Sequence, residues 1–183
     1  MKIDWTTADI REVAATVSEH LHAHGVAATL VGGACVSIHS HNKYQSSDLD
    51  FVTYASLKEL ETVLTGLGFR RQGRSRLFTR DDCAFVLDFV APPIDIGLER
   101  VDSVRGVQVL QTDMGELRLL TPTNCVKDRL AAYYHWDDPQ SLEQAVMVAQ
   151  AQAADVDLPD VERWSRRESH LAKFRVFLEQ LVN

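Results

Sequence analysis

The chain has 183 residues, of which 45% are hydrophobic and 25% are charged, and its formal net charge is −7. This balance is typical of a globular protein and excludes a disordered, collagen-like or coiled-coil chain, while the length fits one domain or a compact core with a helical appendage. The negative charge argues against a general nucleic-acid coating protein, which needs an excess of Lys and Arg to neutralise phosphates.

In the first half of the chain, hydrophobic periodicity and turn residues predict helices that alternate with short strands. Thr6 or Thr7 is expected to cap the first helix, Gly25 to end it, and Ser56 to cap the third. The predicted helices span 7–24, 32–39 and 57–67, and the predicted strands span 27–31, 49–53, 69–72, 77–79 and 83–90.

The second half of the chain is predicted to be mainly helical. Strands are indicated only weakly, near 94–96, 107–109 and 117–119. Thr121 followed by Pro122 is a strong helix start, because Thr can cap and Pro suits the first helical position. The predicted helices that follow span 122–135, 140–153, 158–168 and 169–181. We therefore expect a core over residues 1–120 and a helical region over 121–183 packed on it.

No apolar run is long enough to cross a bilayer, and residues 1–7 lack the apolar stretch of a secretion signal, so we expect a cytoplasmic protein with no membrane partner. The cysteines Cys35, Cys83 and Cys125 are odd in number, far apart and surrounded by apolar neighbours. This pattern predicts buried thiols rather than disulfides or a zinc cluster.

Two short motifs point to nucleotide chemistry. Gly32 and Gly33 close an apolar run, which suits a strand-to-helix turn where backbone N–H groups approach a phosphate. After a short loop, Asp48 and Asp50 occupy alternate positions of a predicted strand, so both carboxylates would lie on one face and could share Mg²⁺. The two motifs together predict that the chain binds a metal-bound triphosphate.

A third carboxylate is needed if two metal ions are to be held. Asp88 is the first candidate, because a charge inside the apolar segment 85–90 is costly unless it is paired or bound to metal. Asp95 is the reserve candidate.

The order of these motifs, Gly-Gly, then two alternate Asp residues, then a single Asp on a later strand, resembles the polymerase-beta-type nucleotidyltransferase superfamily. Within it, the chain is most similar to small bacterial nucleotidyltransferases of the AbiEii and related uncharacterised groups. The resemblance covers residues 30–90 and extends loosely to the helix that begins at Thr121. It implies an α/β (α+β) fold with a short mixed sheet, flanking helices and a C-terminal helical bundle.

The resemblance also implies an activity: transfer of a nucleoside monophosphate from a nucleoside triphosphate such as ATP to an acceptor hydroxyl, with release of pyrophosphate. Asp48, Asp50 and Asp88 would bind Mg²⁺ or Mn²⁺, and Asp88 would help to activate the acceptor hydroxyl as a base. The residues implied to contact the nucleotide are Gly32, Gly33, Ser37, Lys43, Ser46 and Arg129.

The chain departs from the family pattern at two of these places. Tyr44 stands where the family has a basic residue, with Lys43 beside it, and Arg129 stands where relatives carry a Lys. Arg129 could still clamp a phosphate through two parallel hydrogen bonds. Ser46 fits the family's hydroxyl position before the Asp pair.

Two alternatives remain open. The chain could be a catalytically idle nucleotide-binding or protein-binding module on the same fold, such as half of a toxin–antitoxin pair. It could also be an enzyme acting on an RNA end, which would dock on the arginine-rich hairpin between Arg70 and Arg80. The sequence leaves the acceptor undetermined among RNA, protein and a small molecule.

Other side chains could also contact a nucleotide. His39 and His41 flank the proposed site, and Tyr133, Tyr134 or Trp136 could stack on a base, although helical spacing places some of these aromatic residues in the core.

Overall fold

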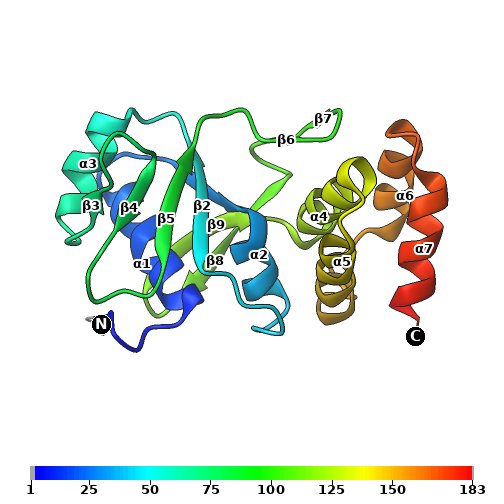
Figure 1. Ribbon diagram of the computed structural model, residues 1–183, viewed down its shortest axis with the longest axis horizontal. Helices are drawn as coiled ribbons and strands as arrows, with labels where there is room; N and C mark the ends of the chain where they lie inside the picture. Colours follow the sequence, from blue (N-terminus) through cyan, green and yellow to red (C-terminus); the bar gives the residue numbers. More distant parts are fainter. Residues whose placement is uncertain (1–2, 183) are drawn as a thin grey trace. The chain divides into compact units, whose positions relative to one another are not determined.

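The computed structural model describes residues 3–182. It has a mixed α/β fold (Figure 1). The helices are α1 (Ile10–Ala23), α2 (Gly32–His39), α3 (Leu57–Thr65), α4 (Pro122–Trp136), α5 (Pro139–Ala151), α6 (Leu158–Arg167) and α7 (Leu171–Leu181). The strands are β1 (Ala28–Val31), β2 (Asp48–Thr53), β3 (Arg70–Arg71), β4 (Leu77–Thr79), β5 (Val86–Val90), β6 (Asp95–Ile96), β7 (Glu99–Arg100), β8 (Val107–Thr112) and β9 (Gly115–Leu120).

Contacts within the chain divide it into two compact units. The first contains the chain up to Ala34 together with Ser46–Pro93 and Gln108–Leu119. The second contains Cys35–Gln45, Ile94–Val107 and the chain from Leu120 onward. The second unit therefore contains the C-terminal helices together with two earlier segments of the chain.

The first unit is built on a mixed sheet with the strand order β3-β4-β5-β2-β1-β9-β8. Strand β2 runs antiparallel to β1 and parallel to β5. Figure 1 shows α1 against the sheet, where it contacts β1 and α3. The mixed sheet with flanking helices agrees with the expected fold class.

One face of the two central strands forms the hydrophobic core of this unit. Leu49 and Phe51 on β2 and Leu87 on β5 have no exposed surface, and Phe89 is 2% exposed. The Phe51 and Phe89 rings stack with their centroids 5.7 Å apart, and Phe78 meets Phe89 edge-on. Because side chains alternate along a strand, the residues between these apolar ones must point to the opposite face.

The first helix begins later than its sequence suggested. Asp9, rather than Thr6 or Thr7, is the N-cap: its side chain accepts from the Glu12 amide at 2.8 Å, and the Glu12 carboxylate accepts from the Asp9 amide at 2.9 Å. This reciprocal pair satisfies two backbone donors at once, which a lone Thr does not. Ser56 and Thr121 cap α3 and α4 as predicted.

Two strand predictions also needed correction. Strand β5 starts at Val86 rather than at residue 83, because Cys83 closes a turn by donating its amide to the Arg80 carbonyl. Strand β7, which the sequence did not indicate, pairs with β6 across a turn at Gly97, whose φ is +59°.

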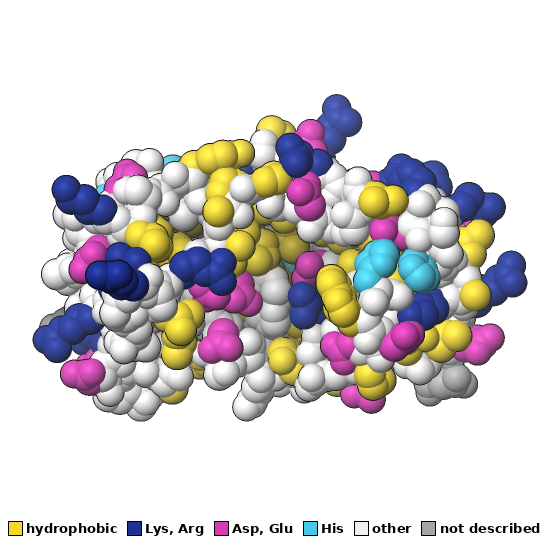
Figure 2. Space-filling model, turned by 45° about the horizontal axis from the view of Figure 1, so that its top comes forward, with side chains coloured by type: hydrophobic (Ala, Val, Ile, Leu, Met, Phe, Trp, Pro, Cys, Tyr) yellow, Lys and Arg dark blue, Asp and Glu magenta, His cyan; other side chains and the backbone are white. Residues whose placement is uncertain are grey.

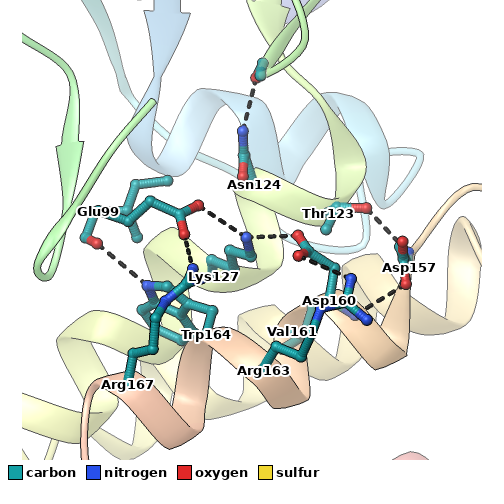
Figure 3. A network of polar contacts seen from close by, with 12 residues as sticks. Glu99, Thr123, Asn124, Lys127, Asp157, Asp160, Val161, Arg163, Trp164 and Arg167 are labelled. Atoms are coloured by element: carbon teal, nitrogen blue, oxygen red, sulfur yellow. Dashed lines mark hydrogen bonds and ion pairs between the residues drawn. The ribbon is translucent and has the colours of Figure 1, made fainter. Parts of the chain in front are cut away.

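The second unit packs α4 against α5 and α6, and α7 against α5 and α6. Figure 3 shows how the β6–β7 hairpin joins this unit: Lys127, 2% exposed, bonds to Glu99 at 3.0 Å and to Asp160 at 2.6 Å. Trp164 donates its indole N–H to the Ile96 carbonyl at 3.3 Å. The hairpin therefore contributes charge partners and carbonyl acceptors that buried helical residues need.

The three thiols are free; Cys35 and Cys125 are fully buried, as predicted, whereas Cys83, which was also predicted to be buried, is only half-buried. Burial raises the pKa of the Cys35 and Cys125 thiols, so both stay protonated and unreactive at neutral pH. Across residues 3–182, no helix combines the length and apolar character that a membrane crossing requires.

Candidate active site

Strand alternation brings three carboxylates to the sheet face opposite the core. On β2, Asp48 is exposed and Asp50 is half-buried, while Leu49 between them is fully buried on the other face. On β5, Asp88 is half-buried between the buried residues Leu87 and Phe89. The sequence prediction that Asp48 and Asp50 share a face follows directly from this alternation.

Strand register places Asp88 beside Asp50. The parallel pairing of β2 with β5 makes these two residues Cα partners, and neighbouring strands lie about 4.8 Å apart. The reserve candidate Asp95 belongs to the second unit, where it bonds to Arg100 at 3.0 Å. Of the two candidates for a third carboxylate, Asp88 is the one that the first unit's sheet holds next to the Asp pair.

The glycine turn touches the same carboxylate. Gly32 follows Val31, the antiparallel partner of Asp50, and it has a φ of +68°. A Cβ atom at Gly32 would lie 2.6 Å from Asp50 Oδ2, so only glycine lets the backbone pass this close to the carboxylate without displacing it. The Gly-Gly turn and the Asp pair, two separate sequence motifs, therefore meet at one place.

The two oxygens of Asp88 have different surroundings. Oδ2 bonds to Arg76 Nη2 at 3.2 Å, whereas Oδ1 is buried and, within the described part of the chain, has no hydrogen-bond partner. A buried acceptor without a donor is costly, and a divalent cation that prefers oxygen ligands would satisfy it. The donor set of three carboxylates therefore suits Mg²⁺ or Mn²⁺.

The carboxylates are nevertheless not gathered around a common point. Among residues 3–182, no three Asp, Glu, His or Cys side chains are close enough together to form a metal site as they stand. Asp88 is turned toward Arg76, and Asp48 is exposed at the start of β2. Binding of a metal by all three would therefore require side-chain rotation.

Ser46 has a structural role at the entrance to β2. Its hydroxyl donates to the Asp48 carbonyl at 3.0 Å and accepts from the Asp48 amide at 3.3 Å. These two hydrogen bonds stabilise the turn that precedes Asp48 and Asp50.

The remaining predicted nucleotide contacts lie in the second unit, so their part in the site stays a prediction. Ser37 is fully buried in α2, and Lys43 is exposed in the following loop. Arg129 bonds through Nε to Asp128 at 3.0 Å and through Nη1 to Gln144 at 3.4 Å. Burial favours a lower pKa for Arg129, but the charge and hydrogen bonds of Asp128 outweigh it and raise that pKa, so the guanidinium stays charged.

His39 and Tyr134 serve packing in the structure. The His39 ring is 3% exposed and bonds through Nε2 to the Leu120 carbonyl at 2.9 Å. Tyr134 is 2% exposed, and its hydroxyl lies 2.8 Å from the Ser165 hydroxyl. Trp136 is 77% exposed.

Arg76 is the residue at this site that sequence reasoning missed. Its position in an arginine-rich hairpin was visible, but its partner Asp88 was not. The contact depends on the antiparallel register that pairs Leu77, the neighbour of Arg76, with Asp88. No local sequence signal encodes that register.

Comparison with known proteins identifies the fold. No family model matches the chain, and no curated protein is significantly similar to it in sequence. A solved antigenic nucleotidyltransferase-like protein from Paracoccidioides brasiliensis matches with a TM-score of 0.56 at 11% identity, over 92% of this chain and 93% of its own.

The antibiotic-resistance factor ANT(2'')-Ia matches in two structures. Its solution structure gives a TM-score of 0.51 at 16% identity, with 94% of each chain covered. Its crystal structure in complex with adenylyl-2''-tobramycin gives a TM-score of 0.54 at 15% identity, over 91% of this chain and 97% of that one. The chain therefore has a nucleotidyltransferase-like fold; at these identities the likeness concerns the fold and not the chemistry.

Proposed function

We propose that this chain is a metal-dependent nucleotidyltransferase, which transfers a nucleoside monophosphate from a nucleoside triphosphate, such as ATP, to an acceptor hydroxyl. The observation that carries the proposal is the close approach of the Gly32 backbone to the Asp50 carboxylate, with Asp88 in register on the next strand. The nucleotidyltransferase-like fold supports it. Closer kinship with the AbiEii group stays a prediction from the motifs.

Each part of the site has a role in this reaction. Asp48, Asp50 and Asp88 would hold Mg²⁺ or Mn²⁺, and the bound cation would neutralise charge on the triphosphate. The amides of Gly32 and Gly33 would orient the terminal phosphates at the start of α2. Asp88 would accept the proton of the acceptor hydroxyl while the hydroxyl oxygen bonds to the α-phosphorus. The bond between the α-phosphorus and the oxygen that it shares with the β-phosphate would break, which releases pyrophosphate.

The acceptor is proposed to be a small-molecule hydroxyl rather than an RNA end. Two arginines of the candidate RNA-docking hairpin already make bonds within the first unit: Arg71 to the Ser75 carbonyl and Arg80 to Asp82. On the face drawn in Figure 2, acidic and hydrophobic side chains lie among the basic ones. ANT(2'')-Ia, which has this fold, was solved with an adenylylated small molecule.

The test is pyrophosphate release from each of the four nucleoside triphosphates, with Mg²⁺ or Mn²⁺ and a cell extract as the source of acceptor. Wild type should release pyrophosphate, and Asp50→Asn should reduce release by at least about 100-fold, because charge stabilisation is the main contribution to phosphoryl transfer. Asp113→Asn, an exposed acid between β8 and β9, is the matched control and should leave the rate unchanged.

The outcomes separate the alternatives. Label transferred from a labelled nucleoside triphosphate to a small molecule supports the proposal. Label transferred to RNA or to protein would assign the acceptor to that class instead. Nucleotide binding without pyrophosphate release would identify an idle binding module. Equal release by wild type and Asp50→Asn would refute the proposed site.

A further inference from the structure

Arg76 is attached to the candidate site in two separable ways. Its backbone carbonyl accepts from the Phe89 amide at 3.3 Å, which fixes the main chain of Arg76 against β5. Its guanidinium bonds to Asp88 Oδ2 at 3.2 Å. The Arg76 side chain is 54% exposed while that of Asp88 is 20% exposed, so the guanidinium can leave the carboxylate for solvent while the backbone stays in place.

We infer that Arg76 is a metal-responsive counter-charge: it holds Asp88 when no divalent cation is bound, and it turns to the triphosphate when one binds. This inference rests on the proposed function. Asp50 and Asp88 are in register, and Asp48 lies on the same face, so three carboxylates lie on one face of two neighbouring strands. A cation at this site takes over the neutralising role of Arg76 and repels its positive charge.

The contact with Asp88 is suited to exchange rather than to permanent structure. An ion pair with one half-exposed partner contributes little to stability, so a divalent cation can displace it at low cost. Asp88 Oδ1, buried and lacking a hydrogen-bond partner within residues 3–182, already offers the cation an oxygen that Arg76 does not use. Displacement of the guanidinium then frees Oδ2 as well.

Phosphate is the natural second partner for the displaced side chain. A guanidinium presents several N–H donors in a planar fork that matches phosphate oxygens. The hairpin around Arg76 is braced independently, because Arg71 donates to the Ser75 and Arg74 carbonyls at 2.8 and 2.9 Å. The arginine side chain can therefore change partner while the turn that carries it keeps its shape.

The inference predicts changes of opposite sign in two binding constants. Arg76→Gln should bind Mn²⁺ alone about threefold more tightly, because the competing charge is gone. The same variant should bind Mg²⁺-tripolyphosphate about tenfold more weakly, because a charge-assisted contact to phosphate is lost. A residue that merely supported the fold would weaken both.

Mn²⁺ binding is measured by electron paramagnetic resonance on the full chain, and tripolyphosphate binding by calorimetry in Mg²⁺. Arg74→Gln removes the same charge from the exposed turn of the same hairpin, and it should change either constant by less than about twofold. Arg76→Lys, which keeps the charge but not the planar fork, should bind Mn²⁺ nearly as wild type does and recover only part of the phosphate affinity.

The possible results test the exchange at Arg76 and the proposed function separately. If wild type binds Mn²⁺ and Arg76→Gln fails to tighten that binding, the exchange is refuted while the proposed function stands. Equal effects of Arg74→Gln and Arg76→Gln would also refute it, since both binding constants would then depend only on the total positive charge of the hairpin. If wild type binds neither Mn²⁺ nor tripolyphosphate, the proposed function and this inference fall together.

Discussion

The backbone of Gly32 lies so close to the Asp50 carboxylate that the conformation of the one limits the position of the other. The φ of +68° at Gly32 turns the chain from β1 into α2, and the missing Cβ leaves room for Asp50 Oδ2. Gly25 has a similar φ of +78°, but a Cβ there would meet nothing within 4 Å. The two glycines therefore separate the cost of a left-handed backbone from the effect of crowding the carboxylate.

We predict that Gly32→Ala and Gly25→Ala lose comparable stability from backbone strain, about 1–2 kcal/mol in the free energy of unfolding measured by urea titration. Only Gly32→Ala should also weaken Mg²⁺-nucleotide binding, by more than about tenfold, because the new methyl group pushes the Asp50 carboxylate aside. Calorimetry on both variants checks this. Equal nucleotide affinities would mean that the close approach has no part in binding.

A second residue-scale effect is the pH dependence that His39 imposes. Burial lowers the pKa of His39, although its hydrogen bond to the Leu120 carbonyl acts in the opposite direction. The folded protein therefore protonates this ring at lower pH than the unfolded chain, in which it titrates near pH 6.5. Its stabilising contribution is complete above about pH 6.5 and is lost as the pH falls from there toward the folded-state pKa.

Accordingly, His39→Gln should make the free energy of unfolding less sensitive to acid between pH 7.5 and pH 5.5, by up to about 1.4 kcal/mol. Urea titrations at the two pH values measure the difference. His22→Gln, at an exposed position on α1, is the control and should keep the wild-type dependence. An unchanged slope in His39→Gln would show that folding does not lower the pKa of this ring.

At the scale of single elements, helix caps decide where the elements begin. Thr6 is used elsewhere: its hydroxyl and its amide both donate to Asp4 Oδ1, at 2.7 and 3.0 Å. Asp9 and Glu12 then form the capping box of α1. The sequence prediction placed the cap at Thr6 or Thr7, whereas the reciprocal bond between Asp9 and Glu12 favours the later start.

Asp9→Ala should therefore lower the free energy of unfolding by about 1 kcal/mol, because two backbone donors of α1 lose their arrangement. Thr7→Ala should stay within about 0.5 kcal/mol of wild type, since Thr7 is exposed and lies outside the helix. Thermal or urea unfolding of the pair measures both. A larger loss for Thr7→Ala would restore the original capping prediction.

At the scale of the whole molecule, the second unit is assembled from distant parts of the sequence. Lys127 needs Glu99, Asn124 donates to the Gly106 carbonyl at 3.0 Å, and Glu168 accepts from the Leu98 amide at 2.7 Å. All three partners belong to segment 94–107, which precedes helices α4–α7 in the chain. The helices alone would lose these contacts to buried polar groups, each of which stabilises the unit.

We predict that a fragment of residues 121–183 does not unfold cooperatively, whereas the full chain does, because the fragment lacks the contacts that segment 94–107 makes with Lys127, Asn124 and Glu168. Circular dichroism during thermal unfolding tests this. A cooperative transition in the fragment would show that the C-terminal helices form a self-sufficient domain. Lys127→Met in the full chain distinguishes the loss of this one contact from loss of the whole segment.

The sequence alone determined the features that depend on near neighbours. Hydrophobic spacing located the helices and central strands, Ser56 and Thr121 marked helix starts, and strand alternation put Asp48 and Asp50 on one face. These features follow from backbone geometry within a few residues, so they can be inferred without knowing what packs against them.

Only the tertiary structure decided which distant groups meet. It placed Asp88 beside Asp50, set Arg76 against Asp88, and joined Glu99 to Lys127. Each of these contacts depends on strand register or on packing between elements far apart in the chain. A shift of one residue in register reverses the face of every side chain, and register is fixed by the fit of the whole buried face.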